Sequence, residues 1–163
     1  MRAVVLADTH IADGRGRALD DRVLAAAADA DLILHAGDVT GPELLATLRE
    51  LAPVHAVLGN NDGALAGVLP EVLHLDLDGV AVTLVHDTGA RAGRAARMAR
   101  RYPAADLVVF GHSHMPEDVA GLDGPRIFNP GSPTQRRRAL VHTFGILEVA
   151  DGRIVDLRHV ELP

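Results

Sequence analysis

The sequence of 163 residues contains no cysteine, and only 2% of its residues are aromatic. The absence of cysteine excludes disulfides, thiolate metal sites and a cysteine nucleophile. The scarcity of aromatic residues argues against a stacking surface for single-stranded nucleic acid. The core must therefore be built mainly from alanine, valine, leucine and isoleucine.

Lysine is absent as well: all 16 basic residues are arginine, and 22 acidic residues bring the net charge to −6. A net negative protein binds nucleic acid and anionic membranes poorly, which argues against both as partners. No apolar run approaches the roughly 18 residues that span a bilayer, and the apolar stretch at the N-terminus is too short for a secretory signal. We expect a cytoplasmic protein with a single domain over residues 1–163. The sequence leaves the oligomeric state open, a homo-oligomer included.

The first part of the chain alternates short apolar strands with amphipathic helices. Strands are expected at 3–7, 32–35 and 53–58, and helices over 20–30 and 41–51. This alternation is typical of a parallel sheet with right-handed crossovers.

The pattern changes after residue 70. Alternating strands over 72–77 and 80–85 flank Asp78-Gly79, which indicates a hairpin. A helix over 90–101 carries five arginines that we expect to face solvent. A strand at 107–110 follows, and the remainder predicts antiparallel strands near 119 and 127 and over 143–149 and 154–160.

Side chains that can bind metal ions follow five of the predicted strands. They are Asp8, His10, Asp38, Asn60, His86, His112 and His114. Because ligands in open α/β sheets bind beyond the carboxyl ends of strands, we expect these residues to lie together. The pairs 8/10 and 112/114 are two residues apart, so both members can point to one side of an extended segment.

Carboxylate, amide and imidazole ligands without thiolate suit Mn²⁺, Fe, Ni²⁺, Co²⁺ or Zn²⁺. Seven ligands are too many for one ion that keeps an open position, but they fit two ions if one carboxylate bridges. Paired ions of this kind clamp the attacking and leaving oxygens in phosphoryl transfer.

The motifs around these residues are DTH, GDVT, GNND, VHD and GHSH, in this order. The series resembles the calcineurin-like metallophosphoesterases, and the NPGSP segment at 129–133 resembles their compact bacterial and archaeal phosphodiesterases. The resemblance implies an α/β fold in which two mixed β-sheets pack as a sandwich flanked by helices. It also implies that one ion takes Asp8, His10 and His114, that the other takes Asn60, His86 and His112, and that Asp38 bridges them.

The activity implied by this resemblance is that of a dinuclear metal-dependent phosphodiesterase, which hydrolyses small phosphate esters by in-line attack of a metal-bridging hydroxide. Its cofactors would be two divalent transition-metal ions, Mn²⁺ foremost, with Ni²⁺, Co²⁺, Fe or Zn²⁺ as alternatives. We expect His112, Asp38 and Asn60 to take part in catalysis. The alternative functions are a non-catalytic scaffold, as in the retromer scaffold subunit of similar fold, and a nuclease.

Three positions depart from the family's pattern. Asn61 stands where many members have a histidine as candidate general acid, Leu58 stands where relatives often have arginine, and Asp87 follows His86 in place of glycine. An amide cannot donate a proton as an imidazolium does. Asn61 therefore predicts that esters with acidic leaving groups react fastest.

Other polar residues have more than one interpretation. Asp62 and Asp87 either orient ligand histidines or shape turns, and the segment 129–132 is expected to form a structural turn. His35 is expected to be a hydrogen-bonded interior residue, and the four remaining histidines partly exposed strand residues. Residues 136–138 are expected to form a solvated arginine loop, with a phosphate contact at the mouth of the site as the alternative. The segment 13–17 could form part of the rim.

Overall fold

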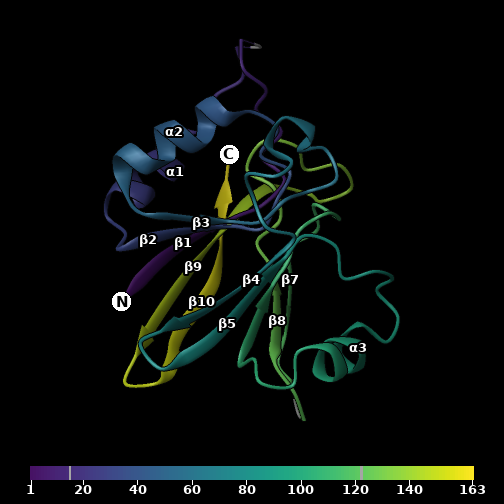
Figure 1. Cartoon of the computed structure of the whole chain (residues 1–163). Helices are drawn as coiled ribbons and strands as arrows, with labels where there is room; N and C mark the ends of the chain where they lie inside the picture. The colour runs from purple at the N-terminus through teal and green to yellow at the C-terminus, as the bar shows by residue number, and fades with distance from the viewer. Residues whose placement is uncertain (15, 122) are drawn as a thin grey trace.

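Two five-stranded sheets pack face to face in the computed structural model of the chain (Figure 1). The structure describes residues 1–14, 16–121 and 123–163. Ala3 and Val5 of one sheet and Leu84, Val109 and Phe128 of the other are fully or almost fully buried in the apolar layer between the sheets. Small aliphatic side chains dominate this layer, as the composition requires.

The first sheet has the strand order β10-β9-β1-β2-β3. Its strands are β1 (Arg2–Leu6), β2 (Leu32–His35), β3 (Val54–Ala56), β9 (His142–Ala150) and β10 (Arg153–Leu162). The expected parallel arrangement is confirmed for β1, β2 and β3, whereas β9 runs antiparallel to β1 and β10 antiparallel to β9. Side chains alternate between the two faces of a strand. Ala3 and Val5 of β1 face the second sheet, whereas Val4 and Leu6 pack against the helices.

Two helices cover the outer face of this sheet, α1 (Asp21–Ala28) and α2 (Pro42–Leu51) (Figure 1). The side chain of Asp20 caps α1 by accepting a hydrogen bond from the Arg22 backbone nitrogen at 2.9 Å. α2 begins with a proline, whose missing N–H is not needed in the first turn. No helix among the described residues has both the length and the apolar character that crossing a membrane requires.

The second sheet has the order β4-β5-β6-β8-β7. Its strands are β4 (Val72–Leu77), β5 (Val80–Val85), β6 (Leu107–Val109), β7 (Glu117–Val119) and β8 (Arg126–Asn129). β4 and β7 run antiparallel to their neighbours, while β6 pairs in parallel with both β5 and β8. Both sheets are thus mixed, as expected. The expectation of purely antiparallel strands after residue 110 is wrong for β8, because the chain crosses over before it and β8 joins β6 in parallel.

The arginine-rich helix differs from its prediction. α3 (Arg94–Arg101) begins four residues later than expected, directly after Gly93, which adopts a left-handed φ of 67°. Arg94 is buried, with its guanidinium 4.7 Å from the Phe110 ring centroid and hydrogen-bonded to Glu117 at 2.6 Å. Arg97 donates to the carbonyl of Thr88. The expected solvated face is wrong for these two arginines, since their stems pack while their heads find carboxylate and carbonyl acceptors.

Candidate metal centre

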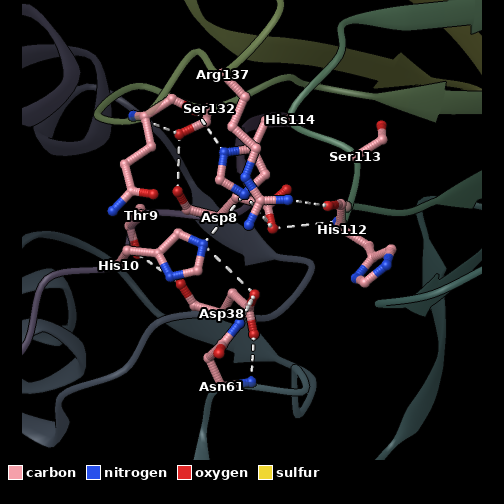
Figure 2. A network of polar contacts seen from close by, with 12 residues as sticks. Asp8, Thr9, His10, Asp38, Asn61, His112, Ser113, His114, Ser132 and Arg137 are labelled. Carbon is pink, nitrogen blue, oxygen red and sulfur yellow. Dashed lines mark hydrogen bonds and ion pairs between the residues drawn. The ribbon is translucent and has the colours of Figure 1, made fainter.

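The residues singled out as metal ligands meet at one edge of the molecule, where strands of both sheets end. Asp8, Asp38 and Asn60 follow β1, β2 and β3 of the first sheet, and His86 and His112 follow β5 and β6 of the second. His10 and His114 lie two residues further along their loops. Packing the two sheets face to face therefore brings five loops from distant parts of the sequence to one place. Figure 2 shows Asp8, His10, Asp38, His112 and His114 within this group.

One group of ligands is buried. Asp8 and His114 are inaccessible to solvent, and the side chain of His10 is only 11% exposed. The Nε2 atoms of His10 and His114 face each other at 3.1 Å, and His114 Nε2 lies 3.5 Å from Asp8 Oδ1. One donor atom from each of these three residues falls within 4.8 Å of the others, which is close enough to share an ion. We call these three residues the buried half.

A second group is open to solvent. His86 Nε2 lies 3.0 Å from Asn60 Oδ1, and His112 Nδ1 lies 2.9 Å from the same oxygen. Asn60 and His112 are exposed, whereas His86 is buried. His86 Nδ1 donates to the carbonyl of Ala36 at 2.8 Å, which orients the ring and leaves Nε2 to face the site. We call Asn60, His86 and His112 the open half.

Asp38 lies between the two halves. Its Oδ2 is 3.4 Å from Nε2 of His10 and 3.5 Å from Nε2 of His86. Asn61 donates to both carboxylate oxygens, from its backbone nitrogen at 2.8 Å and from its side-chain amide at 2.7 Å. The side chain that stands in place of the family's candidate acid is thus directed at Asp38 (Figure 2).

Burial and hydrogen bonding shift the pKa values of these groups in different directions. Burial raises the pKa of Asp8 to about 7 and lowers that of His114 to about 4. Burial also lowers the pKa of His10. The pKa of Asp38 would rise through burial too, but hydrogen bonds from His86 and Asn61 outweigh this and hold it well below its usual range. At neutral pH the histidines of the buried half are therefore neutral, the form that binds metal ions.

The donor set fits divalent metal ions. Asp8 Oδ2 is buried and has no hydrogen-bond partner within the part of the chain that is described. Such an unpaired buried oxygen costs about 1–3 kcal/mol unless something binds it. A cation between Asp8, His10 and His114 would satisfy this oxygen and the facing imidazole nitrogens together. A second candidate group of ligand atoms is formed by Asp8, Asp38 and His86.

The backbone of the ligand loops is unusual. Asp8, His10, Asp38, His112 and His114 all have positive φ, between 45° and 69°. This left-handed region is sparsely populated by residues other than glycine, and its use at functional sites reflects a geometry imposed by the surrounding structure. The paired ligands are therefore not carried on regular extended segments, as their spacing suggested, but at left-handed positions of the loops that follow the strands.

Two features of the neighbouring loops hold Asp38 in place. Asp62 accepts hydrogen bonds from the backbone nitrogens of Asp38 at 2.9 Å, Gly59 at 2.7 Å and Thr40 at 2.6 Å. It shapes the loops and contacts no ligand histidine. Position 37 must be glycine because the ring of His86 lies against its backbone, and a Cβ there would lie 2.7 Å from His86 Nδ1. Of the two interpretations of Asp62, the structure supports the one based on turn geometry.

Asp87 and Asp13 also bind backbone nitrogens. Asp87 accepts from Gly89 at 2.7 Å, which is turn chemistry. Asp13 accepts from Glu43 at 3.2 Å at the start of α2. The structure therefore gives Asp13 a contact with the first turn of α2, the suggested place of the segment 13–17 in the rim stays a prediction, and Arg15 of this segment lies outside the described residues.

The segment 129–132 forms the expected turn. Asn129 donates to the carbonyl of Gly111 at 2.9 Å and accepts from the nitrogen of Gly131 at 2.9 Å. The sequence did not reveal that Ser132 Oγ donates to the carbonyl of Asp8 at 2.7 Å. A serine directly after a tight turn near the site was the only signal for this contact.

The histidines outside the ligand set agree with their predictions. His35 is fully buried, with Nε2 3.0 Å from Thr9 Oγ1, and burial lowers its pKa to about 3. The others are partly or fully exposed: His55, His74, His142 and His159.

The fold and the strand-end loops can be matched to known proteins. The family described as calcineurin-like phosphoesterase superfamily domain matches residues 1–152. The chain belongs to this superfamily. A probable metallophosphoesterase of Methanothermobacter thermautotrophicus is 37% identical over 137 residues, which cover 82% of this chain and 77% of the relative.

Solved structures share the architecture. Vps29 of Entamoeba histolytica complexed with zinc has a TM-score of 0.78 at 23% identity, covering 99% of this chain and 98% of that one. The phosphoesterase YfcE of E. coli has a TM-score of 0.65 at 23% identity, covering 97% and 98%. These structures establish the two-sheet sandwich flanked by helices. Together with the curated relative, the family match assigns the chain to the metallophosphoesterases, which typically bind divalent metals.

Proposed function

We propose that the protein is a dinuclear metal-dependent phosphodiesterase acting on small phosphate esters. The observation that carries this proposal is the convergence of seven ligand side chains from five loops, with Asp38 in contact with a histidine of each half.

The division of ligands follows the geometry of the two halves. Asp8, His10 and His114 would hold one ion, Asn60, His86 and His112 would hold the other, and Asp38 would bridge them. When bound, two divalent ions, with Mn²⁺ preferred, supply an activated water near neutral pH and positive charge for the phosphoryl oxygens.

Three side chains have roles of their own in the reaction. His112 is exposed beside Asn60, so its ring can donate a hydrogen bond to a phosphoryl oxygen as charge develops. Asp38 fixes the two halves relative to each other, and Asn60 Oδ1 lies within 3.0 Å of a ring nitrogen of both His86 and His112, so the three can turn their ligand atoms to one ion. The open half faces solvent, which leaves access for a substrate.

A non-catalytic scaffold of the same fold is the second candidate. The likeness to Vps29 favours it, whereas the complete ligand set favours an enzyme. A nuclease remains the third candidate, and the net charge of −6 argues against long nucleic acid as substrate. We further propose that residues 1–163 act as one domain in the cytoplasm, without a membrane partner.

The deciding experiment is an activity screen of metal-reconstituted protein over phosphomonoesters, phosphodiesters and cyclic nucleotides. The control is the Asp38→Asn protein, used at the same protein concentration and given the same amount of metal. Hydrolysis of diesters that disappears in the control supports the proposal. Two bound ions without hydrolysis of any ester would support the scaffold.

A graded series of diesters tests the consequence of Asn61. In the absence of a general acid, kcat/KM should fall steeply as the pKa of the leaving alcohol rises, since general acid catalysis contributes ~10²–10⁴-fold. Asn61→His should flatten this dependence by accelerating the poor leaving groups. A shallow dependence in the unmodified protein would mean that another group already supplies the proton.

A further inference from the structure

The loop that follows the 129–132 turn is fastened to the ligand loops at three of its residues. Ser132 Oγ donates to the carbonyl of Asp8 at 2.7 Å. Thr134 Oγ1 donates to the carbonyl of Thr9 at 2.5 Å. His114 Nδ1 donates to the carbonyl of Gln135. Residues 132–135 are therefore a fixed part of the metal centre and determine where the arginines after them can reach.

Among these arginines, Arg137 turns back toward the centre. Its φ of 47° lies in the left-handed region, which a non-glycine residue adopts only when surrounding contacts hold it there. Its Nη1 donates to the carbonyl of His112 at 3.3 Å. Figure 2 shows this side chain extending from its loop into the group formed by Asp8, His114 and His112. Arg136 instead donates to the carbonyl of Leu140 in its own loop, at 2.7 Å.

The electrostatics of this position call for an anion. Two divalent ions held by Asp8 and Asp38 leave a formal excess of about two positive charges, and the charge of the ions dominates such a site. The guanidinium of Arg137 adds a further positive charge beside the carbonyl of His112, at the edge of the ligand group. These positive charges repel one another, and an anion bound between them would offset this repulsion.

We propose that Arg137 and the open face of the metal centre form an anion subsite that binds the non-bridging oxygens of a phosphoryl group. The guanidinium has five N–H donors in a planar fork that matches the spacing of phosphate oxygens, and only one contact, to the carbonyl of His112, is made in the structure described. The other donors are available to the ligand. The subsite rests on the proposed function for its metal ions, and it assigns to Arg137 the binding of the substrate's phosphate.

The test is the binding of inorganic phosphate, measured by calorimetry on protein reloaded with Mn²⁺ whose metal content has been determined. The variant is Arg137→Gln, with Arg136→Gln and Arg138→Gln as matched controls from the same exposed loop. Removing a charge-assisted hydrogen bond should raise the dissociation constant of Arg137→Gln about tenfold to a hundredfold. Both controls should stay within about twofold of the unmodified protein. Arg137→Lys should restore part of the affinity, since it keeps the charge without the fork.

The outcomes separate this inference from the proposed function. Equal phosphate affinity in the unmodified protein and Arg137→Gln, at equal metal content, would overturn the subsite. Loss of bound metal in Arg137→Gln would also overturn it, because the arginine would then act on the ligand loops. A selective loss of phosphate affinity supports the subsite even if no ester is hydrolysed, and in that case only the proposed phosphodiesterase activity fails.

Discussion

The two halves of the metal centre use the same kinds of side chain in opposite surroundings. In the buried half, Asp8 and His114 are inaccessible to solvent and are fixed by Ser132 and the carbonyl of Gln135. In the open half, His112 and Asn60 are exposed and contact chiefly each other. The buried half thus belongs to the core of the fold, whereas the open half has a buried His86 but presents Asn60 and His112 to solvent.

This difference in burial suggests that the two halves have different roles. Catalytic metal sites need an open position for substrate, and structural sites are closed. An ion in the buried half would be held tightly and exchange slowly, whereas an ion in the open half would be more accessible. Asp38 connects the two, so variants of the three parts should behave differently.

The largest effect is expected from Asp38→Asn, which should weaken metal binding in both halves and so remove the contrast in how tightly they hold their ions. Because Asp38 contacts a histidine in each, we expect the affinity for both ions to fall by more than the roughly 10–100-fold seen for residues that only support a ligand. Elemental analysis after gel filtration measures the ions retained. Asp87→Asn is the control, since among the described residues Asp87 hydrogen-bonds only to the nitrogen of Gly89. Two retained ions in Asp38→Asn would contradict the bridging role.

Alanine substitutions in the two halves should separate catalysis from stability. His112→Ala should lower kcat by about 10²-fold, the usual contribution of one transition-state donor, and change the free energy of unfolding by less than about 0.5 kcal/mol. His114→Ala should lower that free energy by about 1–3 kcal/mol, since it leaves the carbonyl of Gln135 without its hydrogen bond. Urea unfolding in the presence of a chelator measures the free energy of unfolding without bound metal. Equal stability losses would mean that the halves are equally embedded.

A smaller effect, equal for the two ions, is expected from Asn61→Ala. The variant removes the side-chain hydrogen bond to Asp38 Oδ2 and keeps the backbone one. Residues that orient a ligand in this way contribute about 10-fold or more to metal affinity. Both ions should weaken together, because Asp38 is shared. Titration of the chelated protein with Mn²⁺ checks this, and weakening of a single ion would show that Asn61 acts on one half only.

The smallest effect at neutral pH concerns His35, which lies under the buried half against Thr9. Burial lowers its pKa to about 3 in the folded protein, from 6.5 in the unfolded chain. The unfolded chain therefore binds more protons between these values, so His35 contributes stability that is complete above pH 6.5 and declines as the pH falls toward 3. The expected slope is up to about 1.4 kcal/mol per pH unit. His35→Gln should reduce this slope in urea unfolding measured from pH 7 to 4, and an unchanged slope would show that other groups cause the acid sensitivity.

The sequence predicted several strands well because they have a strong apolar pattern, with glycine or proline close to many of their ends. The strands β2, β4 and β5 have the expected limits. The start of α3 was missed, since nothing local indicated that Gly93 would adopt a left-handed conformation. The burial of Arg94 depends on Glu117, which lies 23 residues away, and no local pattern encodes such a contact.

Of the candidate site, the sequence indicated which side chains gather at the strand ends, but not how they are held. Asp62 could be assigned to its loop only once its three backbone nitrogens were seen. The same is true of Arg137, whose direction follows from its φ and from the anchoring of residues 132–135 to the ligand loops. Both depend on contacts between segments that are distant in the sequence.

The left-handed backbone at five ligand positions has an evolutionary consequence. Each non-glycine residue held there costs of order 1–3 kcal/mol, although Asp and His tolerate the region better than most. The fold supports this strain whether or not metal is used, so a descendant that lost the need for metal would gain stability from glycine at positions 8, 10, 38, 112 and 114. Glycine accumulating at these positions would mark a lineage in which catalysis has been abandoned and only the sandwich has been retained.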